Sequence, residues 1–145
     1  MNVNIKKLND NATIPTCGTK YSAGMDMYAC IEEPVIIEPH KTVMVDTGLA
    51  MEIPEGYFGA IYPRSGLSTK RGIVLANNVA VIDSDYRGEI KLPLHNHGAD
   101  IQVIEPHERV AQFIIQPYLP ISWNVVDELN DTERGDKGFG DSGRF

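Results

Sequence analysis

The sequence is poor in cysteine and tryptophan and contains no long apolar run. Its 145 residues include two cysteines and one tryptophan, too few cysteines for a disulfide scaffold and without the spacing of a metal site. No stretch approaches the roughly 18 apolar residues of a transmembrane helix, and the start of the chain has no apolar core of signal-peptide length. We therefore expect a cytoplasmic protein with no membrane partner, in which Cys17 and Cys30 are reduced and partly buried.

Basic residues are also in deficit. The chain has 13 Lys and Arg against 20 Asp and Glu, and a net charge of -7. A general nucleic-acid partner would require a basic patch, so none is expected, although a local basic pocket for phosphates remains compatible with this charge. Turn formers, in contrast, are plentiful: 13 Gly and 9 Pro accompany a hydrophobic fraction of 42%, which is typical of a turn-rich globular domain.

Short β-branched apolar segments recur along the chain, and each is closed by Gly, Pro, Asn or Asp. This spacing predicts an all-β sandwich or barrel. One short helix is expected over 65–70, where a serine could cap the start and Gly72 could end it. The expected strands cover 35–37, 42–45, 57–62, 72–75, 90–94, 101–104, 109–116 and 121–126.

The apolar pattern stops after residue 126. We expect a single domain over 1–126 and a mobile C-terminal arm over 127–145, because the arm cannot supply a core. Phe139 lies between two glycines in this arm, with Arg134 and Lys137 nearby. An arm with an aromatic ring, cations and free backbone amides can close over a nucleoside triphosphate, and a frayed polar terminus is the alternative.

Residues 81–90 predict a hairpin with a buried acid at its mouth. Val81 and Ile82 lead into Asp83, Tyr86 follows three residues later, and Gly88 forms a turn. A carboxylate beside a planar ring can position a water and pack against a sugar or base. Simple turn formation by Asp and Gly is the alternative.

Arg64, Ser65 and Gly66 follow an expected strand and open the expected helix. Glycine permits close backbone approach, the serine hydroxyl donates to phosphate oxygen, and arginine forks onto phosphate or carboxylate. For an isolated tripeptide, helix capping is the alternative. The chain has no Walker-type loop, which excludes a P-loop NTPase.

Five ordered motifs resemble the trimeric dUTPase family. They lie at 22–29, 63–68, 81–90, 109–115 and 134–143, and the resemblance runs from about residue 5 to the C-terminus. It implies a distorted β jelly-roll and a homotrimer whose sites draw motifs from all three chains. It also implies Mg²⁺-dependent hydrolysis of dUTP to dUMP and pyrophosphate by water attack on the α-phosphorus. That reaction limits uracil incorporation into DNA and supplies dUMP for thymidylate synthesis.

The resemblance also implies roles for individual residues. Asp83 would be the catalytic base that orients the water, and Tyr86 would pack on the deoxyribose and exclude a ribose 2′-hydroxyl. Asn77 and the backbone of 79–82 would form the uracil pocket. The implied substrate-binding residues are Arg64, Ser65, Gly66, Asn77, Val81, Ile82, Asp83, Tyr86, Lys91, Gln112, Arg134, Phe139 and Gly140.

Mg²⁺ prefers to keep its waters and bind substrate phosphates, so Asp26 would reach it only through water. Gln112 would lie near the phosphates or the attacking water. Arg109 is expected in a buried inter-subunit or structural ion pair, and His95 and His97 as surface residues.

Two residues depart from the family pattern. Ala80 replaces a common glycine, which would cost about 1 kcal/mol if its φ were positive. Asp141 replaces a common serine and would place a negative charge near the triphosphate.

Two other functions remain open. A dCTP deaminase of the same fold would need a carboxylate base, and 77–83 offers none before Asp83. A regulatory module would keep the nucleotide pocket and bind a protein partner, as some viral members of the family are thought to do.

Overall fold

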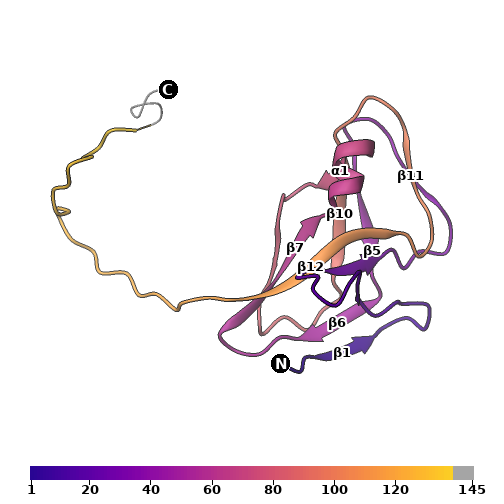
Figure 1. Ribbon diagram of the computed structural model, residues 1–145, viewed down its shortest axis with the longest axis horizontal. Helices are drawn as coiled ribbons and strands as arrows, with labels where there is room; N and C mark the ends of the chain where they lie inside the picture. Colours follow the sequence, from indigo (N-terminus) through magenta and orange to yellow (C-terminus); the bar gives the residue numbers. More distant parts are fainter. Residues whose placement is uncertain (139–145) are drawn as a thin grey trace.

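The computed structural model describes residues 1–138, and these form twelve short strands and one helix. The expected all-β fold is confirmed: the strands form a distorted jelly-roll (Figure 1). In chain order the elements are β1 (Asn4–Lys7), β2 (Thr16–Cys17), β3 (Met25–Tyr28), β4 (Val35–Ile37), β5 (Thr42–Asp46), β6 (Leu49–Glu52), β7 (Tyr57–Pro63), α1 (Ser65–Arg71), β8 (Ile73–Leu75), β9 (Ala80–Ile82), β10 (Lys91–Asn96), β11 (Gln102–Ile104) and β12 (Arg109–Pro117).

The strands pair in four antiparallel sheets. The largest has the order β2-β3-β12-β7-β9, and a second has the order β5-β10-β8. β1 pairs with β6, and β4 with β11. Consecutive strands are therefore often in different sheets, which is the wrapping that a jelly-roll requires. The nine-residue β12 is the centre of the largest sheet, between β3 and β7.

The core lies between the sheets and follows the two-residue period of the strands. In β10, Leu92, Leu94 and Asn96 are buried and their neighbours are more exposed. Asn96 is buried without penalty because its Nδ2 donates to the carbonyl oxygens of Ile37 and Asp100. The largest fully buried side chains are Met27, Ile37, Leu49, Ile61, Ile73, Leu75, Ile90, Leu92, Leu94, Ile104, Val45 and Val110.

The expected helix is present as α1, but a serine does not cap it. Ser65 is already helical, and the N-cap is Arg64, which makes no side-chain capping bond. The Ser65 carbonyl instead accepts hydrogen bonds from the hydroxyls of Ser68 and Thr69. Gly72 ends the helix as expected, in the left-handed conformation with φ 66°.

The expected strand over 121–126 does not form. Residues 118–138, which we call the tail, extend away from the body without regular structure (Figure 1). A strand needs a partner edge, and no other part of the described chain lies beside this segment. Its apolar side chains are consequently exposed: Leu119 87%, Trp123 86% and Val125 93%. The domain boundary at residue 126 stays a prediction. Strands β1, β2, β3 and β6 were not expected, because their residues (NIKK, TC, MDMY and LAME) form no β-branched apolar run.

Both cysteines are free, but only Cys30 is partly buried, and Cys17 is exposed. Burial, followed by the nearby Glu89 and Asp46 carboxylates, raises the pKa of the Cys30 thiol. None of the helices within residues 1–138 has the length and apolarity to cross a bilayer.

Two similar turns hold a histidine in a conformation that favours glycine. His40 and His107 each follow a proline and have φ 60°. Each turn is closed by a backbone bond of 3.1 Å across it, from Lys41 to Glu38 and from Glu108 to Glu105. Proline followed by a residue of positive φ is the pattern of a type II turn, whose third position usually needs glycine.

We expect His40→Gly and His107→Gly each to stabilise the protein by about 1 kcal/mol, because glycine removes the Cβ strain at positive φ. Urea unfolding would measure the gain. His95→Gly is the matched control, because His95 lies in β10 and a strand glycine should cost about 0.5–1 kcal/mol. Loss of stability in the two turn variants would show that the histidine side chains stabilise the turns.

Candidate functional site

One pocket, of about 460 Å³, lies where α1 begins beside β3 and β12. Gln112 of β12 pairs with Asp26 of β3 on one side and with Tyr62 of β7 on the other. Arg64 directly follows β7, so strand pairing brings three separate sequence motifs to this place. We call it the arginine pocket, and its lining includes Asp26, Arg64, Ser65, Gly66, Arg109 and Gln112.

A single carboxylate holds both arginines of this pocket. Asp26 Oδ1 is 2.8 Å from Nε of Arg64, and its Oδ2 is 3.2 Å from Nη1 of Arg109. Nη1 of Arg64 also donates to the carbonyl oxygen of Arg109 at 3.2 Å. Two guanidiniums against one carboxylate leave positive charge, which suits an anion such as phosphate. Arg109 makes the expected structural ion pair, and the partner, Asp26, is in the same chain. The pair is not buried as expected, because the side chain of Arg109 is 52% exposed.

The remaining polar groups of the arginine pocket are placed by the backbone around them. Nε2 of Gln112 donates to the carbonyl oxygen of Pro63 at 2.9 Å, just before Arg64. The lack of a side chain at Gly24 leaves space for the amide group of Gln112, because a Cβ at Gly24 would be 2.6 Å from Oε1 of Gln112. Ser65 and Gly66 are exposed at the start of α1, with their backbone open to a ligand.

A second pocket, of about 410 Å³, is formed around the segment after β9. We call it the tyrosine pocket. Five of the predicted substrate-binding residues line it, together with Met44, Glu89 and Ile90: Val81, Ile82, Asp83, Tyr86 and Lys91.

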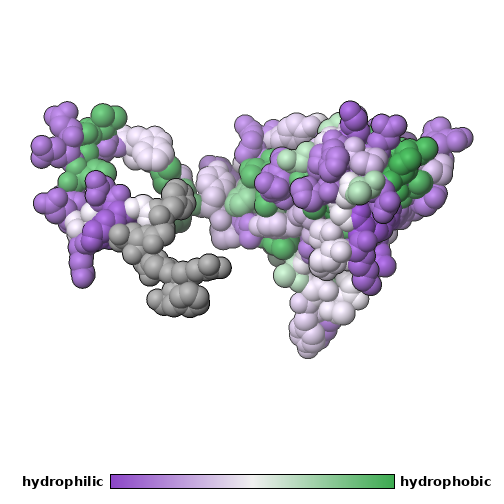
Figure 2. Space-filling model, turned by 90° about the horizontal axis from the view of Figure 1, so that it is seen from above, coloured by the Kyte–Doolittle hydropathy of each residue, from purple (hydrophilic) through white to green (hydrophobic). Residues whose placement is uncertain are grey.

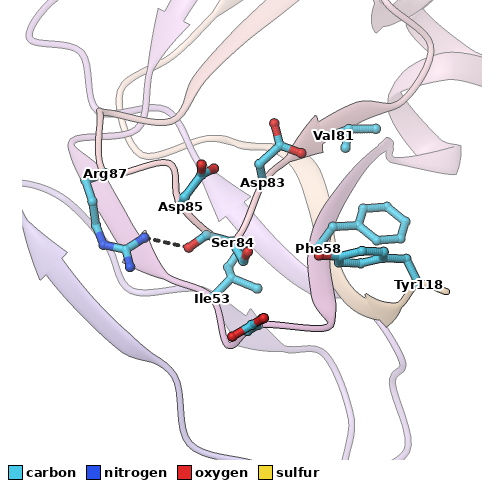
Figure 3. Close-up of a pocket in the computed structure, with 9 residues that line it drawn as sticks. Ile53, Phe58, Val81, Asp83, Ser84, Asp85, Arg87 and Tyr118 are labelled. Atoms are coloured by element: carbon cyan, nitrogen blue, oxygen red, sulfur yellow. Dashed lines mark hydrogen bonds between the residues drawn. The ribbon is translucent and has the colours of Figure 1, made fainter. Parts of the chain in front are cut away.

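The predicted hairpin over 81–90 is wrong, and so is the burial of its acid. β9 pairs with β7, whereas β10 pairs with β5 and β8 in another sheet. The loop between β9 and β10 therefore crosses from one sheet to the other, and Asp83 is exposed at its start. Asp83 also borders a wider hollow of about 880 Å³, which Phe58 and Tyr118 also line (Figure 3).

Backbone and side-chain bonds fix the shape of this loop. The amide of Tyr86 donates to the carbonyl oxygen of Asp83 at 3.2 Å. Nη1 of Arg87 donates to the carbonyl oxygen of Ser84 at 2.6 Å, a bond drawn in Figure 3. Tyr86 is not a core residue: its ring is 44% exposed and its hydroxyl donates to the carbonyl oxygen of Glu89 at 2.9 Å.

Lys91 closes the tyrosine pocket on the side of β5. Its Nζ lies 2.9 Å from Oδ1 of Asp46 and 3.3 Å from Oε2 of Glu89. Hydrogen bonds to these two carboxylates raise the pKa of Lys91, so its ammonium stays charged at neutral pH. Glu89 was not predicted as a site residue, since an isolated glutamate in a turn carries no pattern.

Several predicted site residues are not brought into either pocket. Asn77 is exposed in the turn before β9, and Arg134 lies on the extended tail, where its Nε donates to the carbonyl oxygen of Lys137. Phe139, Gly140 and Asp141 are outside the described residues. Ala80 has no positive φ, so the strain considered for it is absent; the left-handed residue of this turn is Asn78, with φ 61°.

The arginine pocket and the tyrosine pocket occupy opposite ends of β7. Ile82 pairs with Gly59, and Asp83 continues past this pair, away from Pro63 and Arg64. Arg64 is five residues after Gly59 along extended chain, so their Cα atoms are roughly 17 Å apart. One chain therefore cannot bring Asp83 and Arg64 to the same phosphorus atom.

The described residues contain no group of three His, Cys, Asp or Glu side chains that could hold a metal ion. Both carboxylate oxygens of Asp26 already face arginines. This donor set fits a divalent cation only if substrate oxygens and waters supply most of its ligands, with Asp26 contacting such a water.

Comparison with known proteins identifies the family of the chain. The dUTPase family model matches residues 10–143. The deoxyuridine 5'-triphosphate nucleotidohydrolases of Orientia tsutsugamushi (strain Ikeda) and Bordetella avium (strain 197N) are 46% and 48% identical. The first alignment covers 99% of both chains, and the second covers 90% of this chain and 89% of the relative.

Among solved structures, the dUTPase of Staphylococcus bacteriophage 80alpha with dUPNHPP superposes with a TM-score of 0.89. It is 30% identical, with 99% of both chains covered. The family match, the full-length relatives and the shared fold lead to one assignment. The chain belongs to the dUTPase family.

Proposed function

We propose that this protein hydrolyses dUTP to dUMP and pyrophosphate, which limits uracil incorporation into DNA and supplies dUMP for thymidylate synthesis. The observation that carries the proposal is that Asp83 and Tyr86 line one pocket in a chain of the dUTPase family. A carboxylate that can orient water and a ring that can pack on a sugar are the two groups that selective attack on a deoxynucleotide needs.

Asp83 would act on water rather than on the nucleotide itself. Its carboxylate is exposed at the start of the loop, where an oxygen can accept a proton from a water in line with the α-phosphorus. Attack breaks the bond between the α-phosphorus and the bridging oxygen to the β-phosphorus. Pyrophosphate is then the leaving group, and its charge must be stabilised from the other side.

The arginine pocket would supply that stabilisation. Arg64 and Arg109 are held in place by Asp26, and the start of α1 offers the Ser65 hydroxyl and backbone amides. When Mg²⁺ is bound with the triphosphate, it neutralises further charge on the phosphates. We propose that Asp26 contacts this ion through water, because its own oxygens are engaged by arginines.

We further propose that the protein is a homotrimer that acts in the cytoplasm, with dUTP as its substrate. The separation of roughly 17 Å between Gly59 and Arg64 supports a shared site, since a neighbouring copy can bring an arginine pocket to Asp83. The exposed apolar side chains of the tail support assembly, as Figure 2 shows hydrophobic residues on a tail that stands off from the body. A second copy would cover them.

A shared site predicts that two inactive variants complement each other. Asp83→Asn damages only the tyrosine pocket, and Arg64→Ala only the arginine pocket. Refolded together in equal amounts, they should recover hydrolysis at about a quarter of the sites. Half of the copies have an intact tyrosine pocket, and random assembly gives about half of these a neighbour with an intact arginine pocket.

A mixture of Arg64→Ala with Gln112→Ala is the control for this experiment. Both substitutions lie in the arginine pocket, so no copy in this mixture has an intact arginine pocket and no complete site can be assembled. If the first mixture stays as inactive as its parts, the two pockets do not cooperate between copies.

Release of pyrophosphate from dUTP, dCTP, dTTP and UTP tests the substrate. We expect kcat/KM for dUTP to exceed each of the others by at least about a hundredfold, because a ribose hydroxyl or an added methyl has no space in a tight pocket. Ammonia release from dCTP would indicate the deaminase. Binding of dUTP without pyrophosphate release would indicate a regulatory module with a protein partner.

A further inference from the structure

Gly88 lies in the loop after Asp83, and its backbone conformation does not explain why a glycine occupies this position. Glycine is usually required where φ is positive, as it is at Gly48, Gly56 and Gly72. Gly88 does not have a positive φ, so the left-handed conformation that favours glycine is not the reason for a glycine at this position. Its lack of a side chain therefore needs another cause.

That cause is the ring of Tyr86. A Cβ added to Gly88 would lie 2.5 Å from Oη, 2.7 Å from Cζ and 3.0 Å from Cε2 of Tyr86. Contacts this short are repulsive, because carbon atoms pack at about 3.5–4.0 Å. All three nearest atoms belong to the same side chain, so the ring rests directly on the Cα of Gly88.

The ring cannot yield easily at this place. Its hydroxyl is held by the carbonyl oxygen of Glu89 at 2.9 Å. The carboxylate of Glu89 accepts a hydrogen bond from the amide of Gly48 at 2.9 Å and pairs with Lys91. The loop is thereby joined to the segment between β5 and β6, and the position of the ring is set against the body of the protein.

We propose that Gly88 is a positioning residue that sets the choice between deoxyribose and ribose by seating the ring of Tyr86. The proposal rests on the proposed function, in which this ring packs on the sugar. A ring that lies flat on Gly88 has a fixed distance from the sugar, and steric exclusion depends on that distance. An alanine would force the ring away from this place and so change its distance from the sugar.

Steady-state hydrolysis of dUTP and UTP by Gly88→Ala tests the proposal. We expect the ratio of kcat/KM for dUTP over UTP to fall by about tenfold, since a misplaced wall loses the discrimination typical of a shape contact. The loss should appear mainly as a raised KM for dUTP with kcat little changed, because the ring contacts the sugar and not the reacting phosphorus.

The same substitution in a Tyr86→Ala background separates positioning from stability. Without the ring, the added Cβ has nothing to displace, so Gly88→Ala should leave the ratio of Tyr86→Ala unchanged. Gly98→Ala is a matched control, because Gly98 lies outside both pockets, has no positive φ, and a Cβ there would come no closer than 3.3 Å to another atom. It should leave the ratio at the wild-type value.

The outcomes distinguish this proposal from the proposed function. A wild-type protein that prefers dUTP and loses the preference on Tyr86→Ala supports the sugar-packing role of the ring. An unchanged ratio for Gly88→Ala in that case overturns the role of Gly88 alone. The role of Gly88 is also overturned if Gly88→Ala lowers the ratio of kcat/KM for dUTP over UTP equally with and without the ring of Tyr86. A lowered melting temperature with an unchanged ratio overturns it as well.

Discussion

An Asp83→Asn variant should bind dUTP almost as well as the wild type and release pyrophosphate about a thousandfold more slowly, the range expected for removal of a general base. The amide keeps the shape of the carboxylate but cannot accept the proton of the attacking water. Asp83 is exposed and lines both the tyrosine pocket and the wider hollow drawn in Figure 3. Single-turnover release of pyrophosphate, with calorimetric titration of a non-hydrolysable dUTP analogue, would separate the two effects.

Asp85→Asn is the matched control for this prediction. Asp85 lies in the same loop and is exposed like Asp83, but it borders only the wider hollow beside Phe58. We expect its rate to stay within about threefold of the wild type, since surface substitutions change little. An Asp83→Asn rate in that same range would remove Asp83 from the role of base.

Truncation after Asn130 is expected to leave an assembled protein of nearly unchanged melting temperature and to reduce hydrolysis of dUTP by about a hundredfold. The deleted residues contain little apolar surface, so the folded state loses little by their removal. They do contain Arg134 and Phe139, which the family resemblance assigns to the triphosphate and the uracil. Size-exclusion chromatography with light scattering, and pyrophosphate release, would measure the two properties.

A longer truncation, after Tyr118, provides the contrast. It also removes the exposed apolar side chains of Leu119, Trp123 and Val125, which are 86–93% exposed in a single chain. We expect this variant to lose assembly as well as activity, while the backbone bond from Tyr118 to Gly56 is kept. Full activity after truncation at Asn130 would show that the end of the chain takes no part in the reaction.

The strands that were predicted well contain β-branched apolar runs, even where they are only three residues long, as in β4, β8 and β11. In β10 the buried positions alternate, whereas in β12 Val110 and Ala111 are both buried beside an irregularity in the strand register. β2 could not be predicted in this way, because it has only two residues and is ordered by its pairing with β3. The strand expected over 121–126 has the correct composition but lacks a partner within one chain.

The sequence predicted which residues belong to the candidate site, but not how they are arranged in space. Sequence motifs identified Arg64, Gln112 and Asp26, and strand pairing then showed why they meet. No sequence pattern could show that Asp26 holds two arginines, or that Asp83 and Arg64 lie at opposite ends of β7. The error on the hairpin has the same origin: two neighbouring strands were assumed to pair, whereas the jelly-roll places them in different sheets.

The position of the single tryptophan gives the protein a natural optical label. Trp123 lies on the tail, 86% exposed, and the β-strand body contains no other indole. Tryptophan emission will therefore report the surroundings of the tail, while far-ultraviolet circular dichroism reports the sheets. When the protein is diluted or heated, a shift of emission to longer wavelength before the loss of circular dichroism would time the release of the tail from the neighbouring copy that we propose, separately from unfolding.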